Sequence, residues 1–373
     1  MVQIIKADDK LSDFIQVQFE ICGNDPNWVP PLKFERKKLL NKKKNPFYQH
    51  SKMALFLAKK EGKFVGRIAA IINDNHNQTH DDKVGFFGFF DSINNIEVAK
   101  ILFDEATKWL KSQGMESIRG PVNPSMNDEC GLLIDGFDSP PVTLMTYNPP
   151  YYQDLIEGYG FNNAKDLYAY KLINGQYKSE KLSRLDSALR NRYGIEIKAL
   201  DFKNKARFKE GVEIIKSIYN AAWEKNWGFV KFTDEEFDAL AADLKSVADA
   251  DYALIAYIKG KPVGFALGLP DINQTLIYNR NGGLLKGIFH LLTKKSKIDT
   301  LRIIVLGVIE DYRNKGIDAI LYNELGDRGL KKGIKYGEAS WILEDNEEMK
   351  RAATQIMKGE LYKTYRIYEK SIV

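Results

Sequence analysis

The sequence contains very little cysteine and no long apolar run, and these two absences exclude several classes of protein. Cys22 and Cys130 are the only cysteines among 373 residues, so a disulfide scaffold and a zinc site of clustered cysteines are both excluded. The longest strongly apolar stretch lies near residues 303–309, far short of the roughly 20 residues that cross a bilayer. The first ten residues lack the apolar core of a signal peptide. We therefore expect a cytoplasmic protein.

The chain also lacks a strong charge of one sign. Lys and Arg together number 55, against 50 Asp and Glu residues, which gives a net charge of +5. This excess is too small to indicate a nucleic-acid partner by itself. Hydrophobic residues make up 44% of the chain, which is enough to form ordinary buried cores. The length predicts two or three domains at roughly 150 residues each.

Two parts of the chain show the same order of predicted elements. Each has a strand, one or more helices, a tight hairpin, a further strand, an amphipathic helix, and then strands and helices in alternation. The hairpin turns are Glu61-Gly62-Lys63 and Lys259-Gly260-Lys261. A mixed sheet with helices on both faces would bury either set. The sequence thus predicts an α/β fold with tandem domains at 1–173 and 195–373, joined by a polar linker at 174–194.

The predicted elements have the following bounds. In the first part, strands are expected at 2–6, 53–59, 64–72, 84–90, 117–120, 142–147 and 166–173, and helices at 11–21, 96–113 and 149–157. In the second part, strands are expected at 196–199, 252–258, 262–269, 301–309, 336–343 and 361–369, and helices at 208–224, 235–247, 317–330 and 347–358.

The stretch IIVLGVIEDYRNKGIDAILYNEL, residues 303–325, carries the most chemical information. A buried strand ends at Val308, and a turn through residues 313–316 leads into a helix that begins near Ile317. Free backbone N–H groups and the helix dipole converge at such a start, so the segment predicts a phosphate or pyrophosphate site. The spacing matches neither the dinucleotide fingerprint nor the P-loop. The alternative is an ordinary helix start with surface charges.

This stretch resembles the acyl-CoA loop of the GNAT superfamily of N-acetyltransferases. That loop reads Arg/Gln-x-x-Gly-x-Gly/Ala after a lead-in that holds a Val and then (Tyr/Phe)-Arg, and Val308, Arg313 and Gly316 match it, while Asp318 stands where the family keeps a small residue. Asn346 resembles the family's Asn before a later helix, although it also suits a helix N-cap. The cofactor-binding residues that the resemblance implies are Val308, Arg313, Asn314, Lys315, Gly316, Ile317, Asp318 and Asn346.

The first part resembles the same fold without the loop. The segment NPPYYQDLIEGYGF, residues 148–161, is similar to the family's ending, but no Arg-x-x-Gly-x-Gly pattern precedes it. The whole chain therefore resembles tandem acyltransferases, with a degenerate first copy and a second copy that keeps the cofactor site. The resemblance implies transfer of an acyl group from acetyl-CoA or another acyl-CoA to an amine, with no metal ion and with the Val308 backbone facing the thioester.

The candidate catalytic residues are two acids and one tyrosine. A base must deprotonate the amine, and Glu344 and Glu129 are the candidates for this role. The family's usual tyrosine is missing, since alanines stand near its expected position, so Tyr365 is the candidate general acid. The alternative for Tyr365 is simple packing within a strand.

A long polar loop covers residues 120–141. Long loops of this kind often carry function, and Asn123, Ser125 and Asn127 are candidate substrate-binding residues. The alternative is turn chemistry, in which these side chains only satisfy a tight backbone path.

Two further patterns favour plain surface structure. His76 and His80 have the spacing of a helical metal site, but their polar surroundings favour a solvated loop. The basic run at 33–44 favours a solvated helix over an RNA contact. We expect a small-molecule or peptide amine as partner, and neither a membrane nor a nucleic acid. A non-catalytic binding protein and a Fem-like transferase that uses aminoacyl-tRNA remain alternatives, and the oligomeric state stays open.

Overall fold

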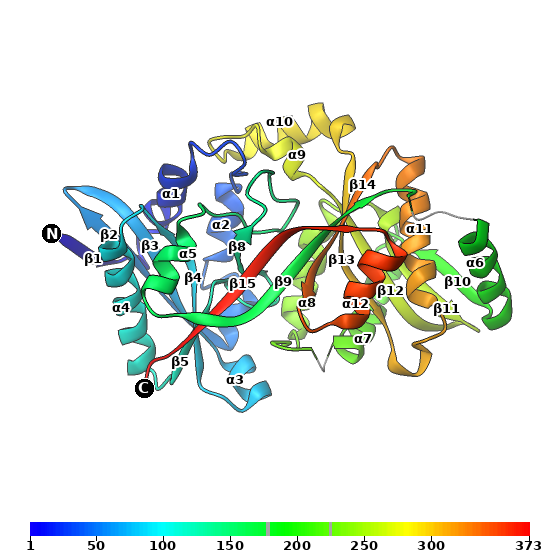
Figure 1. Ribbon diagram of the computed structural model, residues 1–373, viewed down its shortest axis with the longest axis horizontal. Helices are drawn as coiled ribbons and strands as arrows, with labels where there is room; N and C mark the ends of the chain where they lie inside the picture. Colours follow the sequence, from blue (N-terminus) through cyan, green and yellow to red (C-terminus); the bar gives the residue numbers. More distant parts are fainter. Residues whose placement is uncertain (177–179, 224–225) are drawn as a thin grey trace. The chain divides into compact units, whose positions relative to one another are not determined.

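The computed structural model describes residues 1–176, 180–223 and 226–373 and divides into two compact units (Figure 1). Unit 1 contains residues 1–168, 273–295 and 363–373, and unit 2 contains residues 169–272 and 296–362. Neither unit is one continuous segment of the chain. Strands β9 (Asn162–Ile173) and β15 (Glu360–Ser371) each contribute residues to both units. The domain boundaries at 173 and 195 were predicted from a repeat in the sequence. The division into compact units does not test them, so they stay a prediction.

Unit 1 begins with the elements of the first repeat. Its strands are β1 (Val2–Lys6), β2 (Ser51–Lys60), β3 (Lys63–Asn73), β4 (Val84–Ser92), β5 (Ser117–Gly120), β6 (Val122–Asn123), β7 (Glu129–Cys130) and β8 (Leu132–Asp135). Its helices are α1 (Leu11–Cys22), α2 (Lys33–Leu39), α3 (Asp74–His80), α4 (Ile96–Ser112), α5 (Tyr152–Gly158), α9 (Asn273–Leu276) and α10 (Leu284–Lys294), with a short 3-10 turn at Pro46–Gln49.

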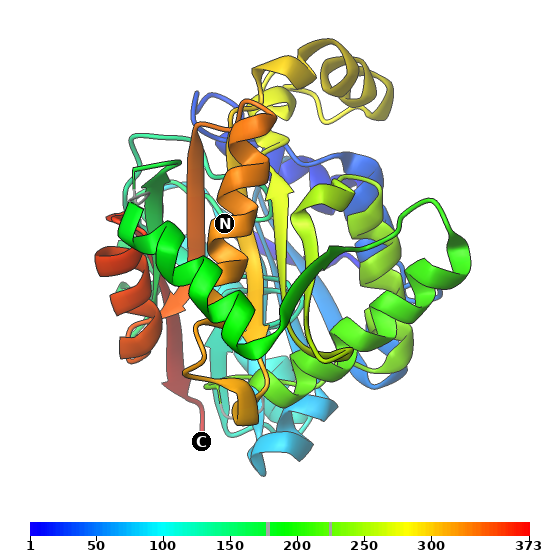
Figure 2. The same cartoon turned by 90° about the vertical axis from the view of Figure 1, so that its right-hand side faces the viewer.

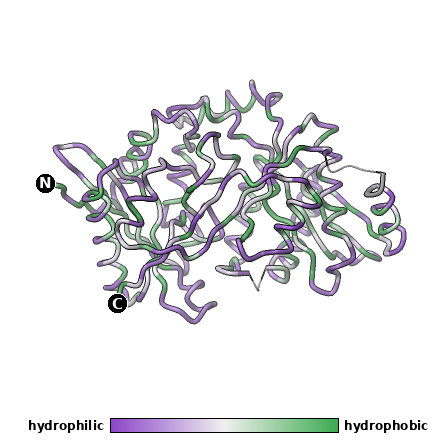
Figure 3. The backbone as a smooth tube through the Cα atoms, in the orientation of Figure 1, coloured by the Kyte–Doolittle hydropathy of each residue, from purple (hydrophilic) through white to green (hydrophobic). Residues whose placement is uncertain are grey.

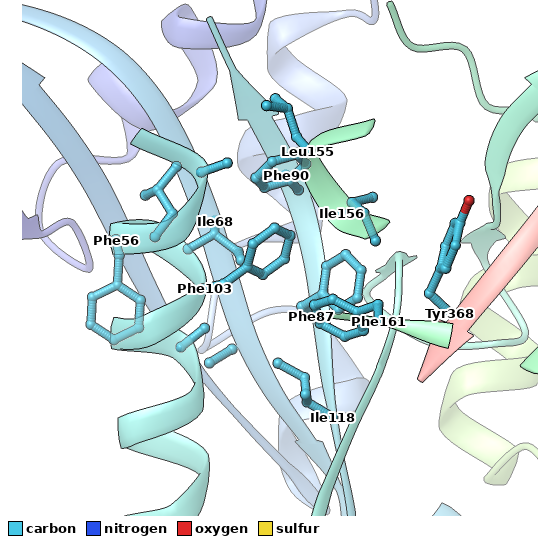
Figure 4. Packing of buried hydrophobic residues seen from close by; sticks show 14 of the residues in the cluster. Phe56, Ile68, Phe87, Phe90, Phe103, Ile118, Leu155, Ile156, Phe161 and Tyr368 are labelled. Carbon is cyan, nitrogen blue, oxygen red and sulfur yellow. The ribbon is translucent and has the colours of Figure 1, made fainter. Parts of the chain in front are cut away.

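The sheet of unit 1 has the order β1-β2-β3-β4-β5-β15-β9. The pair β4–β5 is parallel, whereas β1–β2, β2–β3, β3–β4 and β5–β15 are antiparallel. Ile68 of β3 packs with α4 in an aromatic core that includes Phe87 and Phe103 (Figure 4). The neighbouring Arg67 donates to the Phe14 carbonyl of α1 instead. Because adjacent strand residues point to opposite faces, α1 and α4 cover opposite faces of this sheet.

Unit 2 holds the second repeat. Its strands are β10 (Ile195–Ala199), β11 (Ala253–Ile258), β12 (Lys261–Pro270), β13 (Thr300–Val308) and β14 (Tyr336–Leu343), with the end of β9 beside β14. Its helices are α6 (Glu180–Tyr193), α7 (Lys205–Trp223), α8 (Asp234–Lys245), α11 (Ile317–Lys331) and α12 (Glu347–Arg351). Short turns of helix cover Ala250–Tyr252, Lys295–Lys297, Glu310–Tyr312 and Ala352–Ile356.

The sheet of unit 2 has the order β9-β14-β13-β12-β11-β10, and β13–β14 is its parallel pair among the registers described. Helix α11 packs on one face of this sheet, in a core with Leu254 and Ala266. It is the orange helix in Figure 2. Helix α7 packs on the other face against Ile255 and Phe265. In both units the hydrophobic residues follow the strands (Figure 3).

The two hairpins share one turn geometry. Glu61 and Gly62 have φ of 51° and 82°, and Lys259 and Gly260 have φ of 50° and 79°. Two consecutive positive φ values define the type I′ turn, which fits the twist of a two-residue hairpin. The order of strands around each hairpin is also the same, as the repeat in the sequence predicts.

Several predicted elements are wrong in detail. The strand expected at 142–147 is absent, although Val142, Thr143 and Met145 are buried there. Two prolines directly precede this segment and Leu144 has a positive φ of 63°, so its apolar pattern reflects burial without a sheet ladder. Helices α9 and α10 were not expected. Part of the predicted linker, residues 177–179, and Glu224 of a predicted helix lie outside the described residues.

Candidate active site

Strands β13 and β14 pair only at their start. The parallel register joins Thr300–Ile303 to Tyr336–Ala339, and the ladder then ends, although β13 continues to Val308 and β14 to Leu343. We call this separation the β13–β14 fork. The register described between the two strands therefore covers only the first part of each strand.

A β-bulge lies at the base of the fork. On the other edge of β13, Gly268 is opposite Ile303 but Leu267 is opposite Val305, so Ile304 is the extra residue. A bulge bends the strand and redirects the backbone groups beside it. The bulge directly follows the last residue that pairs with β14. The bulge therefore lies at the point where β13 and β14 stop pairing.

The helix that follows β13 begins without a side-chain cap. Its N-cap is Gly316, which has φ +73° and no side chain to accept a hydrogen bond. The first intrahelical bond described runs from the Ile320 N–H to the Gly316 carbonyl, at 3.1 Å. The N–H groups of the three intervening residues have no intrahelical partner, and the positive end of the helix dipole lies there. This geometry fits the phosphate group that the sequence predicts.

A side chain at position 316 would collide with helix α6. An ideal Cβ there lies 2.7 Å from Leu189 Cδ1, closer than real Cβ contacts. The preceding Asn314 also has a positive φ, of 62°. The backbone conformation therefore favours glycine at 316, and a Cβ there would also force the Leu189 side chain of α6 to shift.

The charged residues of this loop have partners inside unit 2. Arg313 Nε is 3.4 Å from the Val308 carbonyl oxygen and its Nη2 is 3.2 Å from that of Ala222. Lys315 donates to the Asp311 carbonyl at 3.0 Å. Asp318 is partly exposed in the first turn of α11. Their predicted roles in cofactor binding, like those of Val308, Asn314 and Ile317, stay predictions.

A buried polar cluster that the sequence did not predict lies beside the fork. Arg302 and Glu338 face each other in the register of β13 and β14, and they are only 2% and 1% exposed. Arg302 Nε donates to Ser340 Oγ at 3.1 Å, and Ser340 Oγ donates to Glu338 Oε1 at 2.6 Å. The Tyr362 hydroxyl donates to Glu338 Oε2. The signal in the sequence that could have located this cluster is a single charged residue within each of two otherwise apolar strands.

This cluster and helix α11 lie on opposite faces of the sheet. Leu301 and Ile303, which flank Arg302 in β13, line an apolar pocket with Tyr322 and Leu325 of α11. Alternation along the strand therefore directs Arg302 away from α11. The pocket has a volume of about 40 Å³, which is room for a water molecule or two. Burial, with a smaller effect from Asp318, raises the pKa of the Tyr322 hydroxyl, so Tyr322 is neutral.

The predicted residues after β14 have local structural roles. Asn346 is the N-cap of α12, and its Oδ1 accepts the Met349 N–H at 3.0 Å. The Glu344 backbone carbonyl accepts a hydrogen bond from Lys350 Nζ. Both residues belong to unit 2 and follow the strand that carries Glu338. The N-cap interpretation of Asn346 is confirmed, and the catalytic role of Glu344 stays a prediction.

The other predicted site residues belong to unit 1. Arg36 Nη2 donates to both carboxylate oxygens of Glu129, each at 2.8 Å. Tyr365 is fully buried in β15. Ser125 Oγ donates to Asp128 Oδ2 at 2.6 Å and accepts the Asn127 N–H at 3.1 Å. These contacts support the turn interpretation of the polar loop, and the proposed substrate contacts of Ser125 and Asn127 remain untested.

Unit 1 contains a fork of the same kind, and its own chain fills it. Strands β4 and β5 pair only over Val84–Phe86, after which β6 lies against β4. The Asn123 Oδ1 accepts the Phe89 N–H at 2.6 Å. A Cβ at Gly88 would lie 1.6 Å from the Val122 carbonyl oxygen. In unit 1 the chain itself therefore lies against β4 beyond the end of the β4–β5 ladder, whereas β14 of unit 2 continues without such an insertion.

Neither a spanning helix nor a metal cluster is found within residues 1–176, 180–223 and 226–373. None of the helices described there is long and apolar enough to cross a membrane. The same residues contain no group of three or more His, Cys, Asp or Glu side chains arranged to hold a metal ion.

Comparison with known sequences yields a family and two full-length relatives. Residues 212–355 match the acetyltransferase (GNAT) family, a range that includes the fork, the bulge and the start of α11. Protein YghO of Escherichia coli is 37% identical over 380 residues, covering 100% of this chain and 95% of the relative. A protein of Caulobacter vibrioides named bacterial ceramide synthase is 33% identical over 376 residues, covering 99% of this chain and 96% of the relative.

Solved structures share the fold along the whole chain. A tandem GNAT protein from the clavulanic acid biosynthesis pathway has a TM-score of 0.58 at 9% identity, covering 100% of this chain and 99% of its own. A GCN5-related N-acetyltransferase from Sphaerobacter thermophilus has a TM-score of 0.55 at 11% identity, covering 99% and 96%. The predicted α/β fold of two tandem GNAT-like domains is thereby confirmed.

Proposed function

Since the chain belongs to the GNAT family of acyltransferases, which transfer an acyl group from acyl-CoA to an amine, we propose that its acceptor is a long-chain amino alcohol. The proposed donor is a fatty acyl-CoA and the product is an amide of the ceramide type. The observation that carries this proposal is the relative named bacterial ceramide synthase, which is 33% identical along 99% of this chain. A ceramide is by definition an N-acylated sphingoid base.

The fork of unit 2 supplies the groups that hold the donor. The uncapped N–H groups at the start of α11 bind the phosphates of CoA, and Gly316 allows the close backbone approach. The acyl thioester lies at the fork, where the backbone at the Ile304 bulge donates to the carbonyl oxygen as negative charge develops on it. This arrangement needs no covalent intermediate on the protein.

The buried cluster supplies the proton chemistry. The ammonium form of the acceptor must lose a proton before its nitrogen attacks the thioester carbon. We assign this role to Glu338, with Ser340 as the relay, because Ser340 Oγ donates to Glu338 Oε1 at 2.6 Å. The tetrahedral adduct then breaks its C–S bond, and the departing thiolate takes up the proton that the nitrogen loses as the amide forms. Arg302 balances the carboxylate charge in these buried surroundings.

The aromatic residues beside β13 favour an apolar substrate. Trp223 stacks on Tyr219 with ring centroids 4.9 Å apart. Its ring lies so close to Gly307 that a Cβ there would be 2.2 Å from a ring carbon. These rings cover the face of β13 opposite α11, which is also the face of Arg302. An alkyl chain that leaves the fork on this side meets an apolar wall.

A matrix of substrates tests the proposal. The purified chain is incubated with acetyl-CoA or palmitoyl-CoA, and with dihydrosphingosine or ethanolamine, and the amide and free CoA are quantified by mass spectrometry. The proposal expects the largest kcat/KM for the pair of long-chain substrates. Preference for acetyl-CoA, or equal rates with ethanolamine, would contradict it. Transfer from aminoacyl-tRNA, or CoA binding without turnover, would instead support one of the two alternatives left by the sequence.

A further inference from the structure

Helix α10 exposes an apolar side that is unusually large for its length. Leu285, Phe289 and Leu292 are 83%, 60% and 76% exposed. Together with Leu284 and Ile288 they occupy positions i, i+1, i+4, i+5 and i+8 of the helix. At about 100° per residue these five side chains fall within one arc of roughly 140°. We call these five residues the α10 apolar face.

The helix is fixed to unit 1 by its opposite side. The Arg280 guanidinium, just before α10, donates to the carbonyls of Gly23, Asp25 and Trp28 at 2.7, 2.8 and 2.7 Å. Gly287 is buried, and a Cβ there would lie 2.7 Å from Leu32 Cδ2. The helix is therefore firmly anchored, and its apolar face is not left exposed by loose packing.

The charge of this segment has one sign. Residues 273–297 contain five basic residues and no Asp or Glu. The basic residues are Arg280, Lys286, Lys294, Lys295 and Lys297. Lys294 Nζ lies 4.4 Å from the ring centroid of Tyr278, which is itself 51% exposed. Basic residues beside an exposed apolar face are typical of helices that lie in the interface of anionic bilayers.

We propose that the α10 apolar face inserts among the headgroups of a bilayer that contains anionic lipid. The helix lies parallel to the surface, with the leucines and Phe289 toward the acyl chains and the lysines at the phosphate level. Such a helix needs no membrane span. A search of the sequence for apolar runs that could cross a bilayer therefore does not detect it, and for this reason we expected no membrane partner. The inference rests on the α10 surface and goes beyond the proposed acyl transfer.

Vesicle co-sedimentation without any substrate tests this inference separately from catalysis. Vesicles of phosphatidylcholine with about one quarter phosphatidylglycerol supply the anionic surface, and pure phosphatidylcholine vesicles the neutral one. We expect wild type to bind the anionic vesicles and the double variant Leu285→Glu/Leu292→Glu to bind at least about ten-fold more weakly. The matched control is Leu185→Glu, because Leu185 is 49% exposed on α6; it should bind like wild type.

Two further measurements complete the test: vesicle binding by variants that lack lysines, and the oligomeric state of the protein in solution. Lys295→Gln/Lys297→Gln should weaken binding to anionic vesicles about ten-fold and leave any binding to neutral vesicles unchanged. Equal binding by wild type and the Leu285→Glu/Leu292→Glu variant, with both folded by circular dichroism, would overturn the inference. So would a wild-type dimer in solution that this variant converts to a monomer, because the apolar face would then be an interface between copies.

Discussion

Arg302 and Glu338 face each other one residue before the last pair of β13 and β14, with Arg302 Nε 3.9 Å from Glu338 Oε1 and both side chains buried. A buried ion pair contributes little net stability, because desolvation offsets the attraction. Its position at the base of the fork, with Ser340 between the two groups, is better explained by the proposed proton transfer than by a contribution to stability.

Glu338→Gln should lower kcat for acyl transfer at least about 100-fold, because the relay loses its proton acceptor. The single change also removes the negative charge opposite Arg302 and should destabilise the fold, by about 3–5 kcal/mol for a buried pair. Rapid-quench turnover and thermal unfolding measure the two effects.

The double variant Arg302→Gln/Glu338→Gln separates stability from catalysis. It removes both charges and should recover much of the lost stability while kcat stays low. Glu347→Gln, a change at a 70% exposed carboxylate that pairs with Lys350, is the control and should retain full activity. Recovery of turnover in the double variant would assign Glu338 a purely structural role.

Arg313→Glu should weaken CoA binding by at least about 1.5 kcal/mol, the loss expected for a charge-assisted contact with phosphate. Isothermal titration calorimetry with CoA gives the affinity. Arg207→Glu is the comparison, because its side chain is 73% exposed on α7 of the same unit. An unchanged affinity in folded Arg313→Glu protein would remove Arg313 from the predicted phosphate site.

Gly316→Ala should lower both stability and CoA affinity. The new Cβ would lie 2.7 Å from Leu189 Cδ1, at a residue with φ +73°. Gly333→Ala is a matched control, since Gly333 has φ +84° and nothing within 4 Å of its Cβ position. Both variants should lose about 1–2 kcal/mol through backbone strain, measured by urea unfolding. Only Gly316→Ala should lose more than that and also bind CoA less tightly; equal behaviour of the two would mean that α6 adapts freely.

The stability of the chain should fall as the pH falls from about 6.5 toward 3, in part because of His76. Burial, with smaller effects from His80 and Arg119, lowers the pKa of His76 to about 3. In this window the unfolded chain binds a proton at His76 that the folded chain does not, so protonation favours unfolding. Urea unfolding of wild type and His76→Phe at pH 5 and 7 measures the effect. The variant should lose less stability at pH 5 than wild type does; an identical loss would exclude this role for His76.

The sequence predicted what is contiguous along the chain and missed what strand pairing creates. The β13 strand, the loop at 313–316 and the start of α11 form one segment, so periodicity and capping rules locate them together. The pair Arg302–Glu338 depends on the register between β13 and β14, and no local pattern encodes a register. The same holds for Asn123, whose contact with the Phe89 N–H joins a loop to a distant strand.

Helix α10 was missed for a different reason. Its sequence LLKGIFHLLTK has an apolar pattern wider than the stripe of a typical core-facing helix. Gly287 in its middle lowers helix propensity, yet it is needed for the close approach to Leu32. The rules that locate amphipathic helices assume that the apolar residues face a core, and here most of them are exposed.

Hydrogen exchange followed by mass spectrometry, with and without a non-hydrolysable acyl-CoA analogue, tests most directly whether the fork of unit 2 is the active site. We expect backbone amide exchange to slow on ligand binding in residues 303–308 and 316–320, because the N–H groups at the bulge and at the start of α11 acquire acceptors. Residues 84–92, whose fork is filled by β6, should show no change. Protection confined to residues 84–92 and 117–123, with none at the start of α11, would contradict the account.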